Sequence, residues 1–255
     1  MRIAIVTSFN KLLYEYYAHR FLHSYNWEFD LHIYHEGWTP SDFDIRDNIH
    51  YIDINSGKNG NQLRRFQNKV GYYNVASTVN GRPDKIIHGT DYKKDAIRFS
   101  YKVFAKTDFI LKSHISNSYD YVFWIDADVI FKKPISKRDV IKKFLPKEYA
   151  ISFIHRPTYY SECGFVGYNL THDSTINFVR KFREQYTSLQ LVKEKEWHDS
   201  FIFDCVRDKW LSGYPQFNLS PQIKKVGNPW PDTPMAEYMD HLKGKARKDA
   251  GEMLK

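Results

Sequence analysis

The sequence predicts an α/β fold in which helices flank one central sheet. A short β-branched run at residues 3–6 is followed by apolar residues at helical spacing between Leu13 and Tyr25, and then by a second strand at 29–34. A strand, a helix and a strand joined by short connections are typical of a parallel α/β sheet. The length of 255 residues suits a single domain of this class.

Apolar periodicity and strand composition predict the remaining elements. They are a third strand at 50–54, a helix at 94–117, a buried strand at 119–131, strands at 150–154 and 164–168, and helices starting near Asp173 and Trp197. The glycine- and asparagine-rich stretch 55–90 shows no clear pattern, which predicts short helices or a functional loop. A proline-rich segment and a short basic helix are expected to close the chain.

Charge and cysteine content narrow the class of protein. The chain carries 38 Lys+Arg and 30 Asp+Glu, a net charge of +8, which favours nucleic acid, a phosphorylated small molecule or an acidic membrane surface as partner. Cys163 and Cys205 are the two cysteines; they form no disulfide framework and predict a cytoplasmic location. The N-terminus has no signal-peptide pattern, and no run approaches the roughly 18 apolar residues of a membrane span.

Two aspartates, Asp126 and Asp128, end the apolar strand at 119–131. Burying a carboxylate without a partner is costly, so this strand end needs cations, hydrogen bonds or a metal. In an extended segment both carboxylates point to the same side, where they could converge on one Mg²⁺ or Mn²⁺ ion. In α/β sheets ligands gather at the carboxyl ends of strands. A plain turn is the alternative, because aspartates commonly close strands.

The run from Val122 to Val129 resembles the D-x-D motif of GT-A-fold glycosyltransferases that use nucleotide sugars. The resemblance implies a Rossmann-like mixed sheet with a nucleotide site at the end of the first strand, where Thr7 and Ser8 would contact the nucleotide. It also implies a basic residue on the preceding helix that faces the diphosphate. The candidates for this role are Lys102 and Lys106, with Arg98 on the same helix.

The late segment from His241 to Lys248 resembles the His-x-x-Gly-x-x-Lys segment of glycogenin and of bacterial lipopolysaccharide galactosyltransferases. The resemblance implies His241 as the third metal ligand. It also implies a diphosphate contact made by Gly244, Lys245, Arg247 and Lys248, with Arg247 where the family has lysine. Two carboxylates with one imidazole favour Mn²⁺ over Mg²⁺. Residues 1–230 would then form the catalytic domain, and residues 231–255 would close over the donor site.

Two further carboxylates are candidates for contacts with the sugar or the acceptor. Glu162 stands in a segment with Gly164 and Gly167, and glycines inside a strand indicate close approach of a ligand or another backbone. Asp199 stands at the start of the helix that follows Trp197, where the resembling enzymes place an acidic sugar contact. A strand bulge and a simple helix cap are the respective alternatives.

The two resemblances together imply a metal-dependent glycosyltransferase that transfers a hexose from a nucleoside diphosphate sugar, UDP-linked, to a glycan or glycolipid acceptor. The glycogenin-like tail implies retention. An inverting enzyme would instead need a carboxylate base near the acceptor hydroxyl, and Glu162 or Asp199 could serve as this catalytic base. The cofactor would be Mn²⁺ or Mg²⁺, the acceptor would contact stretch 55–90, and the net charge would allow peripheral contact with an anionic membrane face. One alternative is a haloacid dehalogenase-type phosphohydrolase with Asp126 as nucleophile. The other is a basic nucleic-acid-binding protein, although no binding module is visible and no nucleic-acid partner is expected.

Overall fold

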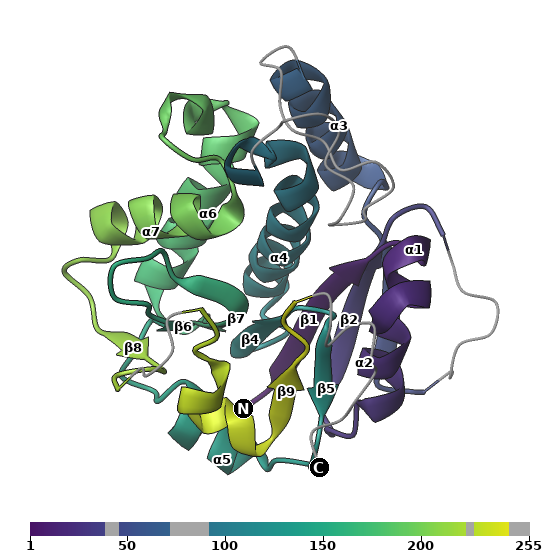
Figure 1. Ribbon diagram of the computed structural model, residues 1–255, viewed down its shortest axis with the longest axis vertical. Helices are drawn as coiled ribbons and strands as arrows, with labels where there is room; N and C mark the ends of the chain where they lie inside the picture. The colour runs from purple at the N-terminus through teal and green to yellow at the C-terminus, as the bar shows by residue number, and fades with distance from the viewer. Residues whose placement is uncertain (39–45, 72–91, 223–226, 245–255) are drawn as a thin grey trace.

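The computed structural model describes residues 1–38, 46–71, 92–222 and 227–244. Within these ranges seven strands form one sheet in the order β3-β2-β1-β4-β7-β6-β8 (Figure 1). The strands are β1 (Ile3–Phe9), β2 (Asp30–His35), β3 (Ile49–Asp53), β4 (Tyr121–Ile125), β6 (Ile151–Ile154), β7 (Glu162–Asn169) and β8 (Gln216–Asn218). A separate two-stranded sheet pairs β5 (Val129–Phe131) with β9 (Met239–His241).

The large sheet is mixed, as predicted. Strands β3, β2, β1 and β4 run parallel, while β7 is antiparallel to β4 and β6 is antiparallel to β7. The chain enters at β1 in the middle of the sheet, continues outward through β2 and β3, and then returns to the other side of β1 as β4. The strand order therefore reverses between β1 and β4, and α/β proteins bind ligands at such a reversal, beyond the carboxyl ends of the strands.

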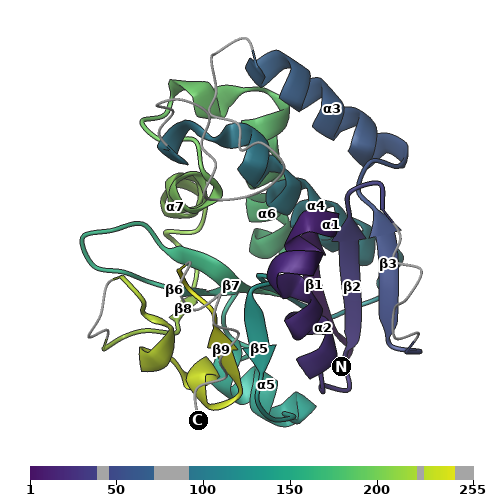
Figure 2. The same cartoon turned by 45° about the vertical axis from the view of Figure 1, so that its right-hand side comes forward.

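Helices cover both faces of this sheet (Figures 1 and 2). One face carries α3 (Gly57–Gly71), α4 (Ala96–Ser116), α6 (Asp173–Thr187) and α7 (Asp199–Trp210). The other face carries α1 (Lys11–Leu13), a π-helical turn at Tyr14–Ala18, α2 (His19–Ser24) and α5 (Lys137–Phe144). Short 3₁₀ turns lie at Tyr92–Lys94, Gln190–Lys193, Trp230–Asp232 and Pro234–Glu237.

The alternation of side chains along β4 explains why the sequence forms a strand buried on both sides. Val122 and Trp124 pack into the core under α4, whereas Phe123 and Ile125 pack into the core on the opposite face. Successive side chains of a strand point to opposite faces, so a continuous apolar run is what a central parallel strand requires. Helix α4 is fixed at its ends by the Asp95 side chain, which accepts from Arg98 N, and by Asn117 with φ +50°.

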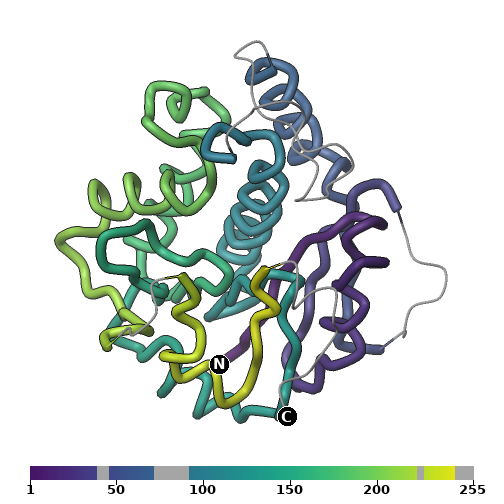
Figure 3. Tube along the Cα trace, in the orientation of Figure 1, coloured from purple at the N-terminus to yellow at the C-terminus, as the bar shows by residue number. Residues whose placement is uncertain are grey.

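Two predictions about the elements need correction. The strand expected at 119–131 is two strands in two different sheets, because the chain turns at Asp126–Asp128 instead of continuing extended. The tail begins as strand β9 and not as the expected basic helix; Figure 3 shows this segment beside β5. The remainder of the expected basic helix, from residue 245 onward, lies outside the described residues. No helix in the described ranges is long and apolar enough to cross a membrane.

Candidate active site

The turn that carries Asp126 and Asp128 lies at the carboxyl end of β4, where the strand order reverses. Backbone hydrogen bonds hold it on both sides. Asp126 N donates to Gly164 O of β7 at 2.8 Å, and Leu242 N donates to Asp128 O at 2.8 Å. The turn is therefore fixed between the main sheet and the C-terminal strand, with its two carboxylates at the edge where ligands bind.

Asp128 and His241 face each other across the small sheet. Val129 and His241 are partners in the β5–β9 pairing, and this register sets His241 Nε2 3.2 Å from Asp128 Oδ1. The buried Trp230 ring packs against the imidazole at 4.9 Å between centroids. Burial lowers the pKa of His241, but Asp128, Glu162 and Asp126 outweigh it, so the pKa lies above its ordinary value.

Asp126 is bound by a lysine of α4. Its Oδ1 accepts from Trp124 Nε1 at 2.7 Å and lies 2.7 Å from Lys102 Nζ. The same ammonium lies 3.2 Å from Asp199 Oδ2. Burial acts to lower the pKa of Lys102, but the two carboxylates outweigh it and raise the pKa above its ordinary value, so the ammonium stays charged. Lys102 therefore joins the two aspartates, which come from β4 and α7.

The basic residues of α4 form a stripe because Arg98, Lys102 and Lys106 are four residues apart. Their depths differ. Arg98 lines an open cavity, Lys102 is 15% exposed, and Lys106 is completely buried, with its Nζ 3.7 Å from Asp199 Oδ2. Burial would raise the pKa of Asp199, but Lys102 and Lys106 outweigh it and hold the pKa below its ordinary value. Lys106 is thus a second cation beside Asp199, and it is completely buried.

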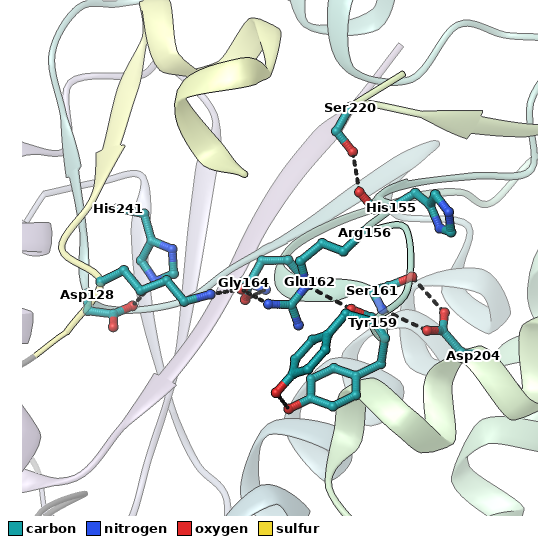
Figure 4. A network of polar contacts seen from close by, with 12 residues as sticks. Asp128, His155, Arg156, Tyr159, Ser161, Glu162, Gly164, Asp204, Ser220 and His241 are labelled. Atoms are coloured by element: carbon teal, nitrogen blue, oxygen red, sulfur yellow. Dashed lines mark hydrogen bonds and ion pairs between the residues drawn. The ribbon is translucent and has the colours of Figure 1, made fainter. Parts of the chain in front are cut away.

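Glu162 at the start of β7 is held by cations from two other segments (Figure 4). Its Oε2 contacts Lys243 Nζ and lies 3.6 Å from Arg156 Nη1, while Oε1 accepts from Gly164 N at 3.3 Å. Burial would raise the pKa of Glu162, but Lys243, His241 and Arg156 outweigh it and lower the pKa. The contact with Lys243 connects this carboxylate to the same C-terminal segment that carries His241.

Gly164 lies at the point where these groups meet. A Cβ at this position would lie 3.4 Å from Glu162 Oε1, 3.4 Å from His241 Cε1 and 3.5 Å from Asp126 Oδ2. Glycine therefore leaves unfilled the space between the β7 backbone, the carboxylates and the imidazole, whereas a Cβ would be in ordinary van der Waals contact with all three groups.

An open cavity of about 540 Å³ adjoins the carboxylates. Glu162 and Asp199 both line it, together with Arg98 and Lys243. Aromatic side chains form a large part of its wall: Tyr92, Phe99, Tyr159, Tyr160 and His198. This volume falls within the range of ordinary small-molecule sites. The cavity thus combines two ionised carboxylates, three cations (Arg98, Arg156 and Lys243) and flat apolar rings, which is a lining suited to a polyhydroxylated ring.

The donor chemistry of Asp128 and His241 fits a divalent cation. Neighbouring ligands about 2.1 Å from an octahedral ion lie about 3 Å apart, close to the 3.2 Å between these two atoms. Asp126 is not yet placed to bind an ion through Oδ1, because this oxygen is paired with Lys102 Nζ. Its Oδ2 lies near Gly164. In the described structure the donor atoms of the three predicted ligands do not all lie within 4.8 Å of one another. Two of the three predicted ligands are thus preformed.

The other predicted site residues differ in how the structure places them. Thr7 is fully buried within β1, which extends to Phe9 and is longer than predicted, whereas Ser8 is half-buried. Gly244 is exposed with φ +91°, a backbone conformation that favours glycine. Lys245, Arg247 and Lys248 lie outside the described residues. His198, and not Asp199 or Ser200, caps α7, because its side chain accepts from Phe201 N.

Sequence reasoning missed several residues of this site. Arg156, to which the sequence analysis assigned no role, is 5% exposed and contacts Glu162. Lys243 was not assigned a role, and no sequence pattern distinguishes it from the neighbouring lysines. Cys163 is not a reactive nucleophile here, because burial and Asp199 raise the pKa of its thiol to about 12.

Three solved structures are similar to this chain. Mouse xyloside xylosyltransferase 1, in its apo form, is 11% identical with a TM-score of 0.50, and the likeness covers 93% of this chain and 92% of that protein. A glycosyltransferase involved in glycosylation of the major capsid of PBCV-1 is 10% identical with a TM-score of 0.45, covering 99% and 100%. The galactosyltransferase LgtC, solved with donor and acceptor sugar analogues, is 14% identical with a TM-score of 0.43, covering 84% and 72%.

No protein-family model matches the chain. No curated protein sequence matches it either. The likeness to the xylosyltransferase extends over nearly the whole of both chains, and it confirms the predicted GT-A architecture.

Proposed function

We propose that this protein is a metal-dependent glycosyltransferase that transfers a hexose from a UDP-linked sugar to a glycan or glycolipid acceptor. The observation that carries the proposal is the contact between Asp128 and His241, with Asp126 in the same turn. This turn lies at the carboxyl end of β4, where the strand order reverses between β1 and β4. The GT-A fold supports the same reaction class.

In this proposal Asp128 and His241, with Asp126, hold a Mn²⁺ ion. The bound ion would supply positive charge to the diphosphate of the donor, which stabilises the leaving group. A mixed set of carboxylate and imidazole donors favours Mn²⁺ over Mg²⁺, because Mg²⁺ seldom takes nitrogen ligands.

Cationic side chains of the protein lie near the proposed metal site. Lys102 stays charged beside Asp126, and Arg98 and Lys243 line the adjoining cavity. Positive groups that are already oriented before the reaction stabilise negative charge as it develops on a leaving diphosphate. We assign this role to Lys102 and not to Lys106, because Lys106 is completely buried.

The cavity beside Glu162 and Asp199 would receive the sugar. Ionised carboxylates accept hydrogen bonds from hydroxyl groups, and the rings of Tyr160 and Phe99 offer flat apolar surfaces for a pyranose. The acceptor would enter through the open side of the same cavity, past Tyr159, which is 48% exposed.

The contacts of the two carboxylates support retention of anomeric configuration. Inversion needs a carboxylate that takes the proton of the acceptor hydroxyl. Glu162 is already held by Lys243 and Arg156, and Asp199 by Lys102 and Lys106, so neither is a strong base. In the retaining route the bond from the anomeric carbon to the phosphate oxygen breaks. The acceptor oxygen then bonds to that carbon on the same face, and its proton passes to the departing phosphate oxygen.

Release of UDP from UDP-glucose and UDP-galactose, followed with and without Mn²⁺, tests the proposal. We expect slow Mn²⁺-dependent hydrolysis that Asp128→Ala reduces at least about 100-fold. NMR of the first sugar product then tests retention separately. Equal UDP release by the wild type and by Asp128→Ala would contradict the assigned site, and an inverted product would contradict the retaining route alone.

A further inference from the structure

Asp30, His32 and His50 form a cluster near the amino ends of β2 and β3. The two histidines are partners in the parallel pairing of these strands, and their rings stack at 4.7 Å between centroids. His50 Nε2 lies 3.8 Å from Asp30 Oδ1. One possible metal-binding atom from each of the three side chains lies within 4.8 Å of the other two. Among the described residues, this is the group of three His, Cys, Asp or Glu side chains that lies so close together.

Tyr119 orients two members of the cluster. Its hydroxyl donates to Asp30 Oδ2 at 2.8 Å and lies 2.9 Å from His32 Nε2. Because the phenol has one proton, which goes to Asp30, His32 Nε2 must be the donor in the second hydrogen bond. His32 is therefore held with its proton on Nε2, so an ion bound by this ring would be bound through Nδ1. Metal-bound histidines characteristically donate their second N–H to an oxygen in this way.

The cluster is both anchored and accessible. The His32 ring packs against Phe109 of α4 at 4.3 Å between centroids, which fixes its position. The side chains of His50 and Asp30 are 44% and 41% exposed, so an ion can reach them from solvent.

We propose that Asp30, His32 and His50 form a second metal site, specific for Zn²⁺ and similar transition ions. Two imidazoles and one carboxylate are a common donor set for zinc, and three protein ligands leave a fourth position for water. Ligands of a tetrahedral zinc ion lie about 3.4 Å apart, so binding draws the exposed side chains of His50 and Asp30 slightly inward. Mg²⁺ is disfavoured, because it prefers oxygen ligands.

This site is independent of the proposed glycosyltransferase site. Asp30 and His50 lie toward the amino ends of the parallel strands, whereas Asp126 follows the carboxyl end of β4. A zinc ion here would join β2 to β3 at the edge of the sheet, which ends at β3. The expected consequence is stabilisation of the folded protein in proportion to zinc occupancy, with no requirement for nucleotide.

Titration with Co²⁺ tests the site directly, because tetrahedral Co²⁺ absorbs in the visible range. We expect a saturable band with one Co²⁺ per chain, displaced by Zn²⁺, and a rise in Tm with Zn²⁺. His50→Gln should weaken binding more than about tenfold, and Tyr119→Phe about tenfold through the loss of the orienting hydroxyl. His50 is exposed, so its substitution should leave the fold intact; the melting temperature without metal verifies this.

Two controls separate this site from others. His114→Gln removes an exposed histidine outside the cluster, and Asp128→Asn removes a ligand of the proposed Mn²⁺ site. Both variants should keep the Co²⁺ band. Absence of the band in the wild type, or an unchanged band in His50→Gln, would overturn the proposal. Loss of the band in Asp128→Asn alone would assign the ion to the D-x-D turn and equally refute the second site.

Discussion

Asp128 Oδ1 and His241 Nε2 lie 3.2 Å apart although they come from the middle and the end of the chain. The β5–β9 pairing produces this contact, and the hydrogen bond from Leu242 N to Asp128 O reinforces it. The metal site that we propose is therefore complete only when the C-terminal strand is in place. In the proposed function, this one pairing would link folding of the tail to binding of the donor.

Replacing Gly164 with alanine should impair the site while leaving the fold intact. The added methyl group would lie 3.4–3.5 Å from Glu162, His241 and Asp126, an ordinary van der Waals contact that fills the space between these groups without displacing the backbone. We expect Mn²⁺-dependent UDP binding to weaken about tenfold, with a change in unfolding free energy below about 1 kcal/mol. Gly213→Ala is the matched control, because a Cβ at that position meets nothing within 4 Å. Equal effects of the two substitutions would refute the close approach at Gly164.

Replacing Lys102 with methionine should destabilise the protein strongly, because it leaves Asp126 and the buried Asp199 without their shared cation. Breaking a buried ion pair by removing one partner costs roughly 3–5 kcal/mol. Urea unfolding at pH 7 measures this cost. Lys112→Met on the same helix is the control: its ammonium is 68% exposed, so we expect at most about 0.5 kcal/mol.

A double-mutant cycle tests how much of the cost at Lys102 comes from its ion pair with Asp199. If Lys102 and Asp199 interact, the double variant Lys102→Met/Asp199→Asn should lose less stability than the sum of the two single losses, because each single substitution already breaks their ion pair. Strictly additive losses from the two substitutions would show that Lys102 and Asp199 do not interact.

The free energy of unfolding should depend on pH through the carboxyl group of Glu36. Burial raises its pKa from 4.5 to about 7, and the hydrogen bond from Asn10 only partly opposes this. The folded state therefore binds the proton more tightly than the unfolded state. The resulting stability is fully present below pH 4.5 and is lost as the pH rises through 7. The Glu36→Gln variant lacks this dependence. The unfolding free energy of the variant minus that of the wild type should therefore be higher at pH 8 than at pH 5, by at most about 3 kcal/mol. Equal differences at the two pH values in urea unfolding would contradict this assignment.

The helices and strands that could be predicted from the sequence are those whose apolar residues follow a local helix or strand periodicity. The apolar run before Asp126 could only be a central strand, and the helix with basic residues at every fourth position could be placed opposite it. The split of 119–131 into two strands was not predictable, because it depends on pairing between β5 and a segment that comes more than a hundred residues later. Lys243 could not be assigned to Glu162 for a similar reason, because 81 residues separate the two side chains along the chain.

Calorimetric titration of UDP into the protein, with and without Mn²⁺, tests the central claim most directly. We predict that the wild type binds UDP tightly only with Mn²⁺. His241→Ala and Asp128→Ala should each weaken this binding more than about tenfold, while both variants stay folded. UDP binding that is equally strong without Mn²⁺, or that survives unchanged in both variants, would contradict a metal-dependent nucleotide-sugar site at Asp128 and His241.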